Sequence, residues 1–136
     1  MENKTILVIE DDAFSMKLVT SLLEIGNFII LEALDAETGI RLAREHRPDL
    51  ILMDIQLPGM DGLSATRSMK YEPALNKTPI VALTANAMVG DKEKALAAGC
   101  TGYISKPIDV KVFLDNLSRF FEYDEKESHS TALTGH

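Results

Sequence analysis

Short apolar runs alternate with helix-like segments along this chain, and that alternation limits the fold more than any other feature of the sequence. Four or five consecutive apolar residues between turn formers are too few for a helix and predict a strand that is buried on both faces. Strands that alternate with helices form a parallel sheet with helices on both sides and right-handed crossovers. We therefore expect a doubly wound, five-stranded α/β fold with strands at residues 6–9, 28–31, 50–53, 79–83 and, more weakly, 102–105.

The first segment between strands has a clear helical period. Phe14, Leu18, Leu22 and Ile25 recur at helical spacing until Gly26 interrupts the pattern. This spacing predicts that these four apolar side chains face the sheet.

Two aspartates are expected to cap further helices, because an Asp side chain at a helix start accepts a backbone N–H. Asp35 precedes a helix that should end before Pro48, and Asp109 precedes the last helix. Other helices are expected after Gly62 and over residues 91–98. The apolar face of the last helix is expected to comprise Val110, Phe113, Leu114, Leu117 and Phe121.

Size, charge and cysteine content exclude several classes of protein. The 136 residues suit one domain, expected over residues 1–123, with a polar and flexible tail at 124–136. A formal net charge of −7 disfavours direct binding to nucleic acid. The apolar runs are far shorter than the ~20 residues that cross a membrane, and the single Cys100 cannot form an internal disulfide. These features lead us to expect a cytoplasmic protein without membrane insertion.

Polar side chains follow four of the predicted strands at the point where each strand ends. In an open parallel sheet these carboxyl ends meet at one edge, where ligands bind. The predicted site therefore gathers three or more carboxylates, a hydroxyl and one ammonium. The polar residues at the four strand ends are Glu10, Asp11, Asp12, Asp54, Gln56, Thr84, Ser105 and Lys106.

This set of groups favours Mg²⁺ and phosphoryl transfer. Neighbouring carboxylates repel unless a cation offsets them, and hard oxygen ligands favour Mg²⁺ over zinc. A carboxylate such as Asp54 can act as a nucleophile toward phosphorus. Lys106 would then meet an incoming phosphoryl oxygen, or Asp54 in its absence, and Thr84 could donate a hydrogen bond to another oxygen.

Each residue also has a purely structural explanation. Asp12 is better explained as a helix N-cap, where an acid complements the helix dipole. Thr84 could be only a hydroxyl at a strand end, and Lys106 with Pro107 could form a turn that faces solvent. Alternatively, a cis peptide at Pro107 could direct Lys106 into the site. Cys100 is expected to be a small buried thiol.

Around these residues the sequence resembles the receiver domains of bacterial two-component response regulators. The resemblance extends from residue 5 to about residue 123 and implies the flavodoxin-like, three-layer sheet with strand order 2-1-3-4-5. The matching segments are I-L-V-I-E-D-D at 6–12, D-L-I-L-M-D-I-Q-L-P-G-M-D-G at 49–62, P-I-V-A-L-T-A-N-A-M at 79–88 and G-Y-I-S-K-P-I at 102–108.

The resemblance implies a phosphoacceptor and a magnesium site. Asp54 would accept a phosphoryl group from a phosphohistidine on a histidine kinase or a histidine phosphotransfer protein. Asp11 and Asp54 would hold Mg²⁺ together with the backbone carbonyl of Gln56, and Glu10 would act through water. Gln56 and Asn86 stand where side chains influence the lifetime of the phosphoryl group, and neither is an acid or a base.

The resemblance also implies a switch. Thr84 and Lys106 would contact the phosphoryl group, and Thr84 and Tyr103 would be the switch pair. The face formed by the fourth helix, the fifth strand and the fifth helix would then change its affinity for an effector protein. The chain would be a signalling domain rather than an enzyme.

Other functions remain open at this point. Within signalling, the chain could pass its phosphoryl group on to a histidine phosphotransfer protein, or be a receiver detached from a hybrid histidine kinase. An aspartate-nucleophile phosphatase would need an acid where Gln56 stands. A flavin-binding electron carrier would need a phosphate loop where Glu10, Asp11 and Asp12 would repel phosphate.

Overall fold

The computed structural model of the chain describes residues 3–57, 59–85 and 90–121. Asn86 and the expected tail at 124–136 lie outside these residues. The strands are β1 (Thr5–Ile9), β2 (Ile29–Ala33), β3 (Leu50–Asp54), β4 (Ile80–Thr84) and β5 (Gly102–Ser105). The helices are α1 (Ala13–Ile25), α2 (Ala36–His46), α3 (Gly62–Lys70) and α4 (Asp91–Ala98), and residues 113–121 are also helical.

The strands form one parallel sheet in the order β2-β1-β3-β4-β5, which confirms the expected doubly wound topology. Every strand pair is parallel. The register places Val8 of β1, Leu52 of β3, Val81 of β4 and Gly102 of β5 side by side across the sheet. All residues of β3 and β4 are buried, as expected for strands covered on both faces.

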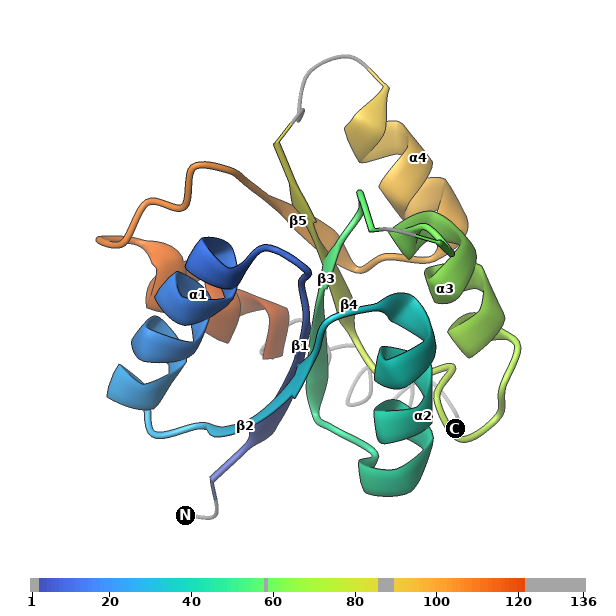
Figure 1. The fold of residues 1–136 in the computed structure, drawn as a ribbon, viewed down its shortest axis with the longest axis horizontal. Coiled ribbons are helices and arrows are strands. Elements are labelled where there is room, and N and C mark those ends of the chain that lie inside the picture. The colour runs from blue at the N-terminus through green and yellow to red at the C-terminus, as the bar shows by residue number, and fades with distance from the viewer. Residues whose placement is uncertain (1–2, 58, 86–89, 122–136) are drawn as a thin grey trace, which may run out of the picture.

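The sheet separates two hydrophobic cores, because successive side chains of a strand point to opposite faces. Figure 1 shows α2, α3 and α4 on one side of the sheet, and α1 with the helix at 113–121 on the other. Leu7, Ile9, Ile51 and Met53 pack toward α2 and α3. Ile6, Val8, Leu50 and Leu52 pack toward α1 and the last helix, where Phe113 and Leu117 are buried.

The predicted inner face of α1 is only partly right. Phe14 and Ile25 are 77% and 70% exposed, whereas Met16, Val19 and Leu23 are buried. Both sets have helical spacing, but at about 100° per residue their centres lie roughly 140° apart around the helix axis, and periodicity alone could not choose between them. Two of the expected residues, Leu18 and Leu22, do pack against the core.

The last helix begins later than predicted. Residues 110–112 form a turn, and the helix starts at 113. The Asp109 carboxylate accepts a hydrogen bond from the Lys111 N–H at 3.0 Å, so it stabilises this turn and does not cap the helix. Val110 is consequently 53% exposed, which corrects its placement on the inner face.

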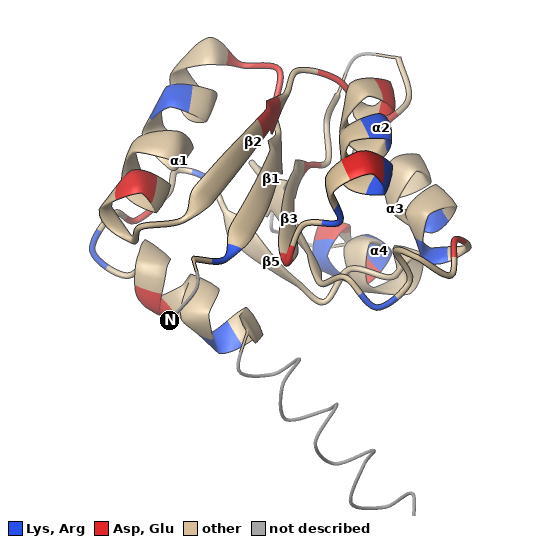
Figure 2. Ribbon diagram, turned by 90° about the horizontal axis from the view of Figure 1, so that it is seen from below, with Lys and Arg blue, Asp and Glu red and all other residues tan. Residues whose placement is uncertain are grey.

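Charged residues lie mainly on helices and loops, as Figure 2 shows. Glu32 and Asp54 are the charged residues within the strands. Among the described residues, no helix combines the length and the apolar character that crossing a membrane requires.

Candidate functional site

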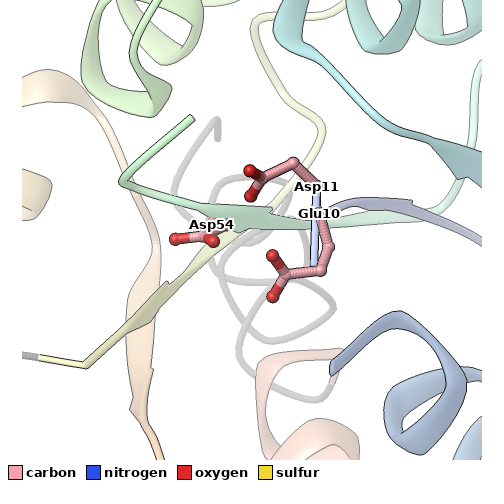
Figure 3. A group of neighbouring side chains, drawn as sticks. All are labelled: Glu10, Asp11 and Asp54. Carbon is pink, nitrogen blue, oxygen red and sulfur yellow. The ribbon is translucent and has the colours of Figure 1, made fainter. Parts of the chain in front are cut away.

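Three carboxylates meet at the carboxyl edge of the sheet. Asp54 is the last residue of β3, and Glu10 and Asp11 directly follow β1. Each offers an oxygen atom within 4.8 Å of the others, and Figure 3 shows the side chains converging. Glu10 is fully buried and Asp54 is 7% exposed, whereas Asp11 is exposed. Adjacent parallel strands therefore place two buried acids and one accessible acid at a single point.

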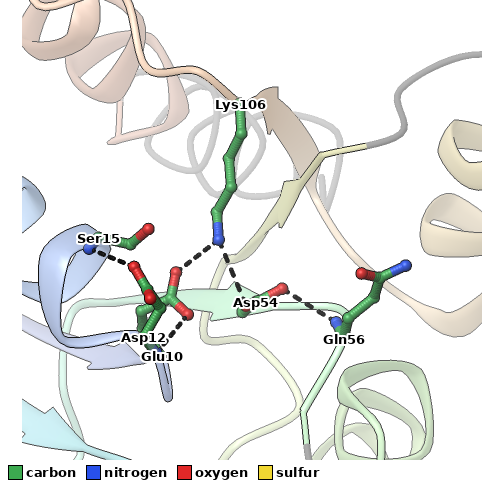
Figure 4. A network of polar contacts seen from close by, with 6 residues as sticks. All are labelled: Glu10, Asp12, Ser15, Asp54, Gln56 and Lys106. Carbon is green, nitrogen blue, oxygen red and sulfur yellow. Dashed lines mark hydrogen bonds and ion pairs between the residues drawn. The ribbon is translucent and has the colours of Figure 1, made fainter.

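Asp12 has a different function from its neighbours. It is the N-cap of α1, and its Oδ2 accepts a hydrogen bond from the Ser15 N–H at 2.8 Å (Figure 4). The backbone and side chain of Ser15 lower the pKa of Asp12 by donating to the carboxylate. The capping explanation of Asp12 is confirmed.

Lys106 points into the acidic cluster. Its Nζ lies 2.6 Å from Glu10 Oε1 and 3.3 Å from Asp54 Oδ2, as Figure 4 shows. The peptide bond between Lys106 and Pro107 is cis. Because the Lys106 ammonium contacts two carboxylates of the cluster, the alternative of a turn that faces solvent is wrong. The sequence pointed to Asp54 as the partner of Lys106, but the shorter contact is with Glu10.

Burial and neighbouring charges act on the pKa values of Glu10 and Lys106, and both pKa values are raised. Burial, with the neighbouring Asp54, raises the pKa of Glu10 to about 7, although Lys106 opposes the shift. Burial alone would lower the pKa of Lys106, but the Glu10 and Asp54 carboxylates outweigh it and raise that pKa. One ammonium thus incompletely offsets the negative charge of the cluster, and a cation would favour the ionised form of Glu10.

The loop after β3 folds back over Asp54. The Gln56 N–H donates a hydrogen bond to Asp54 Oδ1 at 2.9 Å (Figure 4). Gly62 begins α3 beside the same strand end, and a Cβ at this position would lie 2.4 Å from the Asp54 carbonyl oxygen. Residue 62 therefore has to be glycine for α3 to approach β3 this closely.

Thr84 ends β4 and is held by α4. The residue is 3% exposed, and its Oγ1 donates a hydrogen bond to Asp91 Oδ2 at 3.2 Å. The sequence did not identify Asp91, because an acid in the first turn of a helix is common for reasons of the helix dipole alone. Tyr103 lies on the neighbouring strand β5, where the Lys92 Nζ is 5.4 Å from the centroid of its ring.

The acidic cluster fits a magnesium ion. Its three members offer hard oxygen atoms, and neither histidine nor cysteine belongs to the cluster. His46 is in the last turn of α2. Cys100 is buried with its Sγ 3.8 Å from Thr66 Oγ1 of α3, and its burial raises the pKa of the thiol, as expected for a structural residue.

Comparisons with known proteins point to one family. The model of the response regulator receiver domain matches residues 6–118. The chain is 42% identical over 117 residues to the polar-differentiation response regulator DivK of Brucella anthropi, and the match covers 86% of this chain and 95% of that protein. The DivK protein of Brucella ovis is 41% identical with the same coverage.

Solved structures agree with this result. The receiver domain of the sensor histidine kinase PA1611 from Pseudomonas aeruginosa, which has a magnesium ion coordinated in its active-site cleft, superposes with a TM-score of 0.83. It is 34% identical, and the match covers 89% of this chain and 99% of that one. The chemotaxis protein CheY4 of Vibrio cholerae has the same fold, with a TM-score of 0.83 at 24% identity over 88% of this chain and 99% of CheY4.

Proposed function

The chain belongs to the response regulator receiver domain family, and from that premise we propose that Asp54 accepts a phosphoryl group from a phosphohistidine. The donor would be a histidine kinase or a histidine phosphotransfer protein, since receiver domains interact with histidine kinases and effectors. The observation that carries the proposal is the contact of one ammonium, that of Lys106, with two buried carboxylates, Glu10 and Asp54. A fixed positive charge beside a nucleophilic carboxylate is what phosphoryl transfer requires.

The proposed step is a direct displacement at phosphorus. A carboxylate oxygen of Asp54 attacks the phosphorus of the phosphohistidine, and a new O–P bond forms as the P–N bond breaks. The electron pair of the P–N bond stays on the imidazole nitrogen. Because Asp54 is only 7% exposed, a donor has to reach it from the open edge of the sheet.

Asp11 and Asp54 are the proposed direct ligands of Mg²⁺, with the backbone carbonyl of Gln56 as a third. Glu10 would act through water. A magnesium ion bound there would neutralise charge on the transferring phosphoryl group. The hard oxygen atoms of the cluster support this arrangement, as does the magnesium ion of the PA1611 receiver.

Lys106 and Thr84 would stabilise the phosphoryl group once it is on Asp54. The Lys106 Nζ, at 3.3 Å from Asp54 Oδ2, needs only a small movement to reach an oxygen bonded to phosphorus. The Thr84 hydroxyl lies at the end of the adjacent strand and would donate to a second oxygen. Neither residue is consumed in the step, so both would act through charge and hydrogen bonding.

Phosphorylation would act on partners through a switch pair, Thr84 and Tyr103. Movement of both residues toward Asp54 would shift the equilibrium between two conformations of the face formed by α4, β5 and the helix at 113–121. An effector protein that binds one state of this face better than the other would then read the signal.

A phosphate shuttle is the second candidate function. In that case the chain passes its phosphoryl group to a histidine phosphotransfer protein, as a receiver detached from a hybrid kinase would. The 34% identity to the receiver of a sensor histidine kinase favours this candidate. Rapid transfer from phosphorylated Asp54 to a purified histidine phosphotransfer domain would support it.

We further propose that residues 1–123 are the functional domain, apart from residues 124–136, and that the protein works in the cytoplasm. The family model, which ends at residue 118, supports this division. The net charge of −7 supports protein partners over direct contact with nucleic acid.

Intact-protein mass spectrometry after incubation with acetyl phosphate tests the proposal. The wild-type protein is expected to gain one phosphoryl group in the presence of Mg²⁺ and none in the presence of EDTA. Asp54→Asn, which keeps the size of the side chain, should gain none in either condition. An equal gain in the wild type and in Asp54→Asn would refute the assignment.

A further inference from the structure

The first turn of α4 contacts both residues of the proposed switch pair. Asp91 is the first residue of α4, and its Oδ2 accepts the hydrogen bond from Thr84 Oγ1 at 3.2 Å. The next residue, Lys92, places its Nζ 5.4 Å from the centroid of the Tyr103 ring. Two consecutive residues of one helix thus contact the side chains of Thr84, on β4, and Tyr103, on β5.

The contact with Asp91 competes with the proposed role of Thr84. A threonine hydroxyl has one proton to donate. While that proton is directed to the Asp91 carboxylate, it cannot be directed to a phosphoryl oxygen on Asp54. An Oγ1–Oδ2 distance of 3.2 Å is long for a hydrogen bond to a carboxylate, so breaking this hydrogen bond has a modest cost.

The contact of Lys92 acts on the other member of the pair. An ammonium near the face of a tyrosine ring is attracted to the ring, more weakly at exposed positions than at buried ones. Lys92 is exposed and Tyr103 is partly buried. Movement of Tyr103 toward Asp54 would separate the ring from this ammonium.

We propose that Asp91 and Lys92 are positioning residues that hold Thr84 and Tyr103 in the unphosphorylated arrangement. This inference rests on the proposed function, because it needs a phosphoryl group on Asp54 to compete for Thr84. We call the pair Asp91 and Lys92 the α4 latch. Phosphorylation has to release the α4 latch, so the strength of the latch sets how readily the domain switches.

Titration with beryllofluoride, a mimic of the phosphoryl group, in excess Mg²⁺ measures the latch directly. Asp91→Ala should bind the mimic about threefold to tenfold more tightly than the wild type, because Thr84 no longer has to leave a charged acceptor. Asp91→Asn keeps an acceptor without the charge, and it should bind with intermediate affinity. This second variant also serves if Asp91→Ala weakens the start of α4.

A double-mutant cycle separates the hydrogen bond from a simple effect of charge. In a Thr84→Ala background, Asp91→Ala should no longer change the affinity for beryllofluoride. If the gain in affinity persists without the Thr84 hydroxyl, it comes from the removal of a negative charge near the site, and the latch is refuted.

The Lys92 contact has its own matched control. Lys92→Gln should increase the affinity for beryllofluoride about twofold to fivefold, whereas Lys94→Gln, the same change of charge at an exposed position of α4, should leave it unchanged. Equal effects of the two substitutions would overturn the role of Lys92.

The titration of the wild type distinguishes a failure of this inference from a failure of the proposed function. If the wild type neither binds beryllofluoride nor gains a phosphoryl group from acetyl phosphate, the proposed function is wrong, and the α4 latch is refuted as well. If the wild type does both and the affinities of Asp91→Ala and Asp91→Asn equal its own, only the latch is wrong.

Discussion

Lys106 and Glu10, which are 96 positions apart in the sequence, form an ion pair of 2.6 Å between Nζ and Oε1 at the carboxyl edge of the sheet. Glu10 is fully buried, so this contact compensates a carboxylate that bulk solvent does not hydrate. The same ammonium also lies 3.3 Å from Asp54 Oδ2. In the proposed function, this ammonium compensates the two acids before phosphorylation and contacts the phosphoryl group after it.

Glu10→Gln should remove a pH-dependent loss of stability from the metal-free protein. The pKa of Glu10 is raised to about 7 from its ordinary 4.5, so the folded protein holds this proton more tightly than the unfolded chain does. The folded state therefore loses stability as the pH rises from 4.5 to about 7, and the loss remains above that range. For one group with such a shift the loss is at most about 3 kcal/mol.

Urea unfolding in EDTA at about pH 5 and about pH 8 measures this effect. The free energy of unfolding should fall less with pH in Glu10→Gln than in the wild type. Glu32→Gln, a matched change at an exposed position of β2, should follow the wild type. Parallel pH dependence in all three proteins would contradict the raised pKa of Glu10.

Asp11→Asn should weaken Mg²⁺ binding at least tenfold, because it removes the charge of a proposed direct ligand. Asp12→Asn is the matched control, since Asn also caps helices and Asp12 is the N-cap of α1. Isothermal titration calorimetry compares the two affinities. A loss of affinity that is as large in Asp12→Asn as in Asp11→Asn would mean that the ion is bound elsewhere.

Lys106→Ala should slow phosphorylation by acetyl phosphate about tenfold or more while leaving Mg²⁺ affinity within a few fold of the wild type. The reason is that Lys106 would contact the phosphoryl group, whereas the proposed ligands of the ion are carboxylate and carbonyl oxygens. The rate is measured by intact mass over time, with exposed Lys17→Ala as the control. Loss of Mg²⁺ binding with an unchanged rate would reverse the assigned role.

Gly62→Ala should lower the free energy of unfolding by about 2 kcal/mol or more, since its Cβ would meet backbone. The collision is with the Asp54 carbonyl oxygen, at 2.4 Å, so Mg²⁺ affinity should fall as well. Ser64→Ala, at an exposed position two residues further along α3, should affect neither property strongly. Chemical denaturation and calorimetry measure both, and an unaltered Gly62→Ala protein would contradict the close packing of α3 on β3.

Much of the fold could be predicted from the sequence, because local signals decide it. The apolar runs locate the buried strands β3 and β4 within one residue. Asp35 caps α2 by accepting from the Thr38 N–H at 2.7 Å, as the cap signal predicts. The convergence of Glu10, Asp11 and Asp54 also follows from the sequence, since strand ends in a parallel sheet share one edge.

The remaining features depend on distances that no local pattern contains. Phe14 and Ile25 have the same spacing as a buried face, yet packing on the sheet rotates α1 so that both are exposed. The preference of Lys106 for Glu10 over Asp54 and the hydrogen bond from Thr84 to Asp91 depend on how closely separate elements approach. Such contacts can be identified only in the three-dimensional structure.

The measurement that tests the central claim most directly is the location of the phosphoryl group. Borohydride reduces an aspartyl phosphate to homoserine, so the phosphorylated protein is reduced, digested and sequenced by tandem mass spectrometry. We expect homoserine at position 54 in the sample that contained Mg²⁺, and unmodified Asp54 in the sample that contained EDTA. Homoserine at position 11 or 12 instead, with Asp54 intact in both samples, would contradict the account.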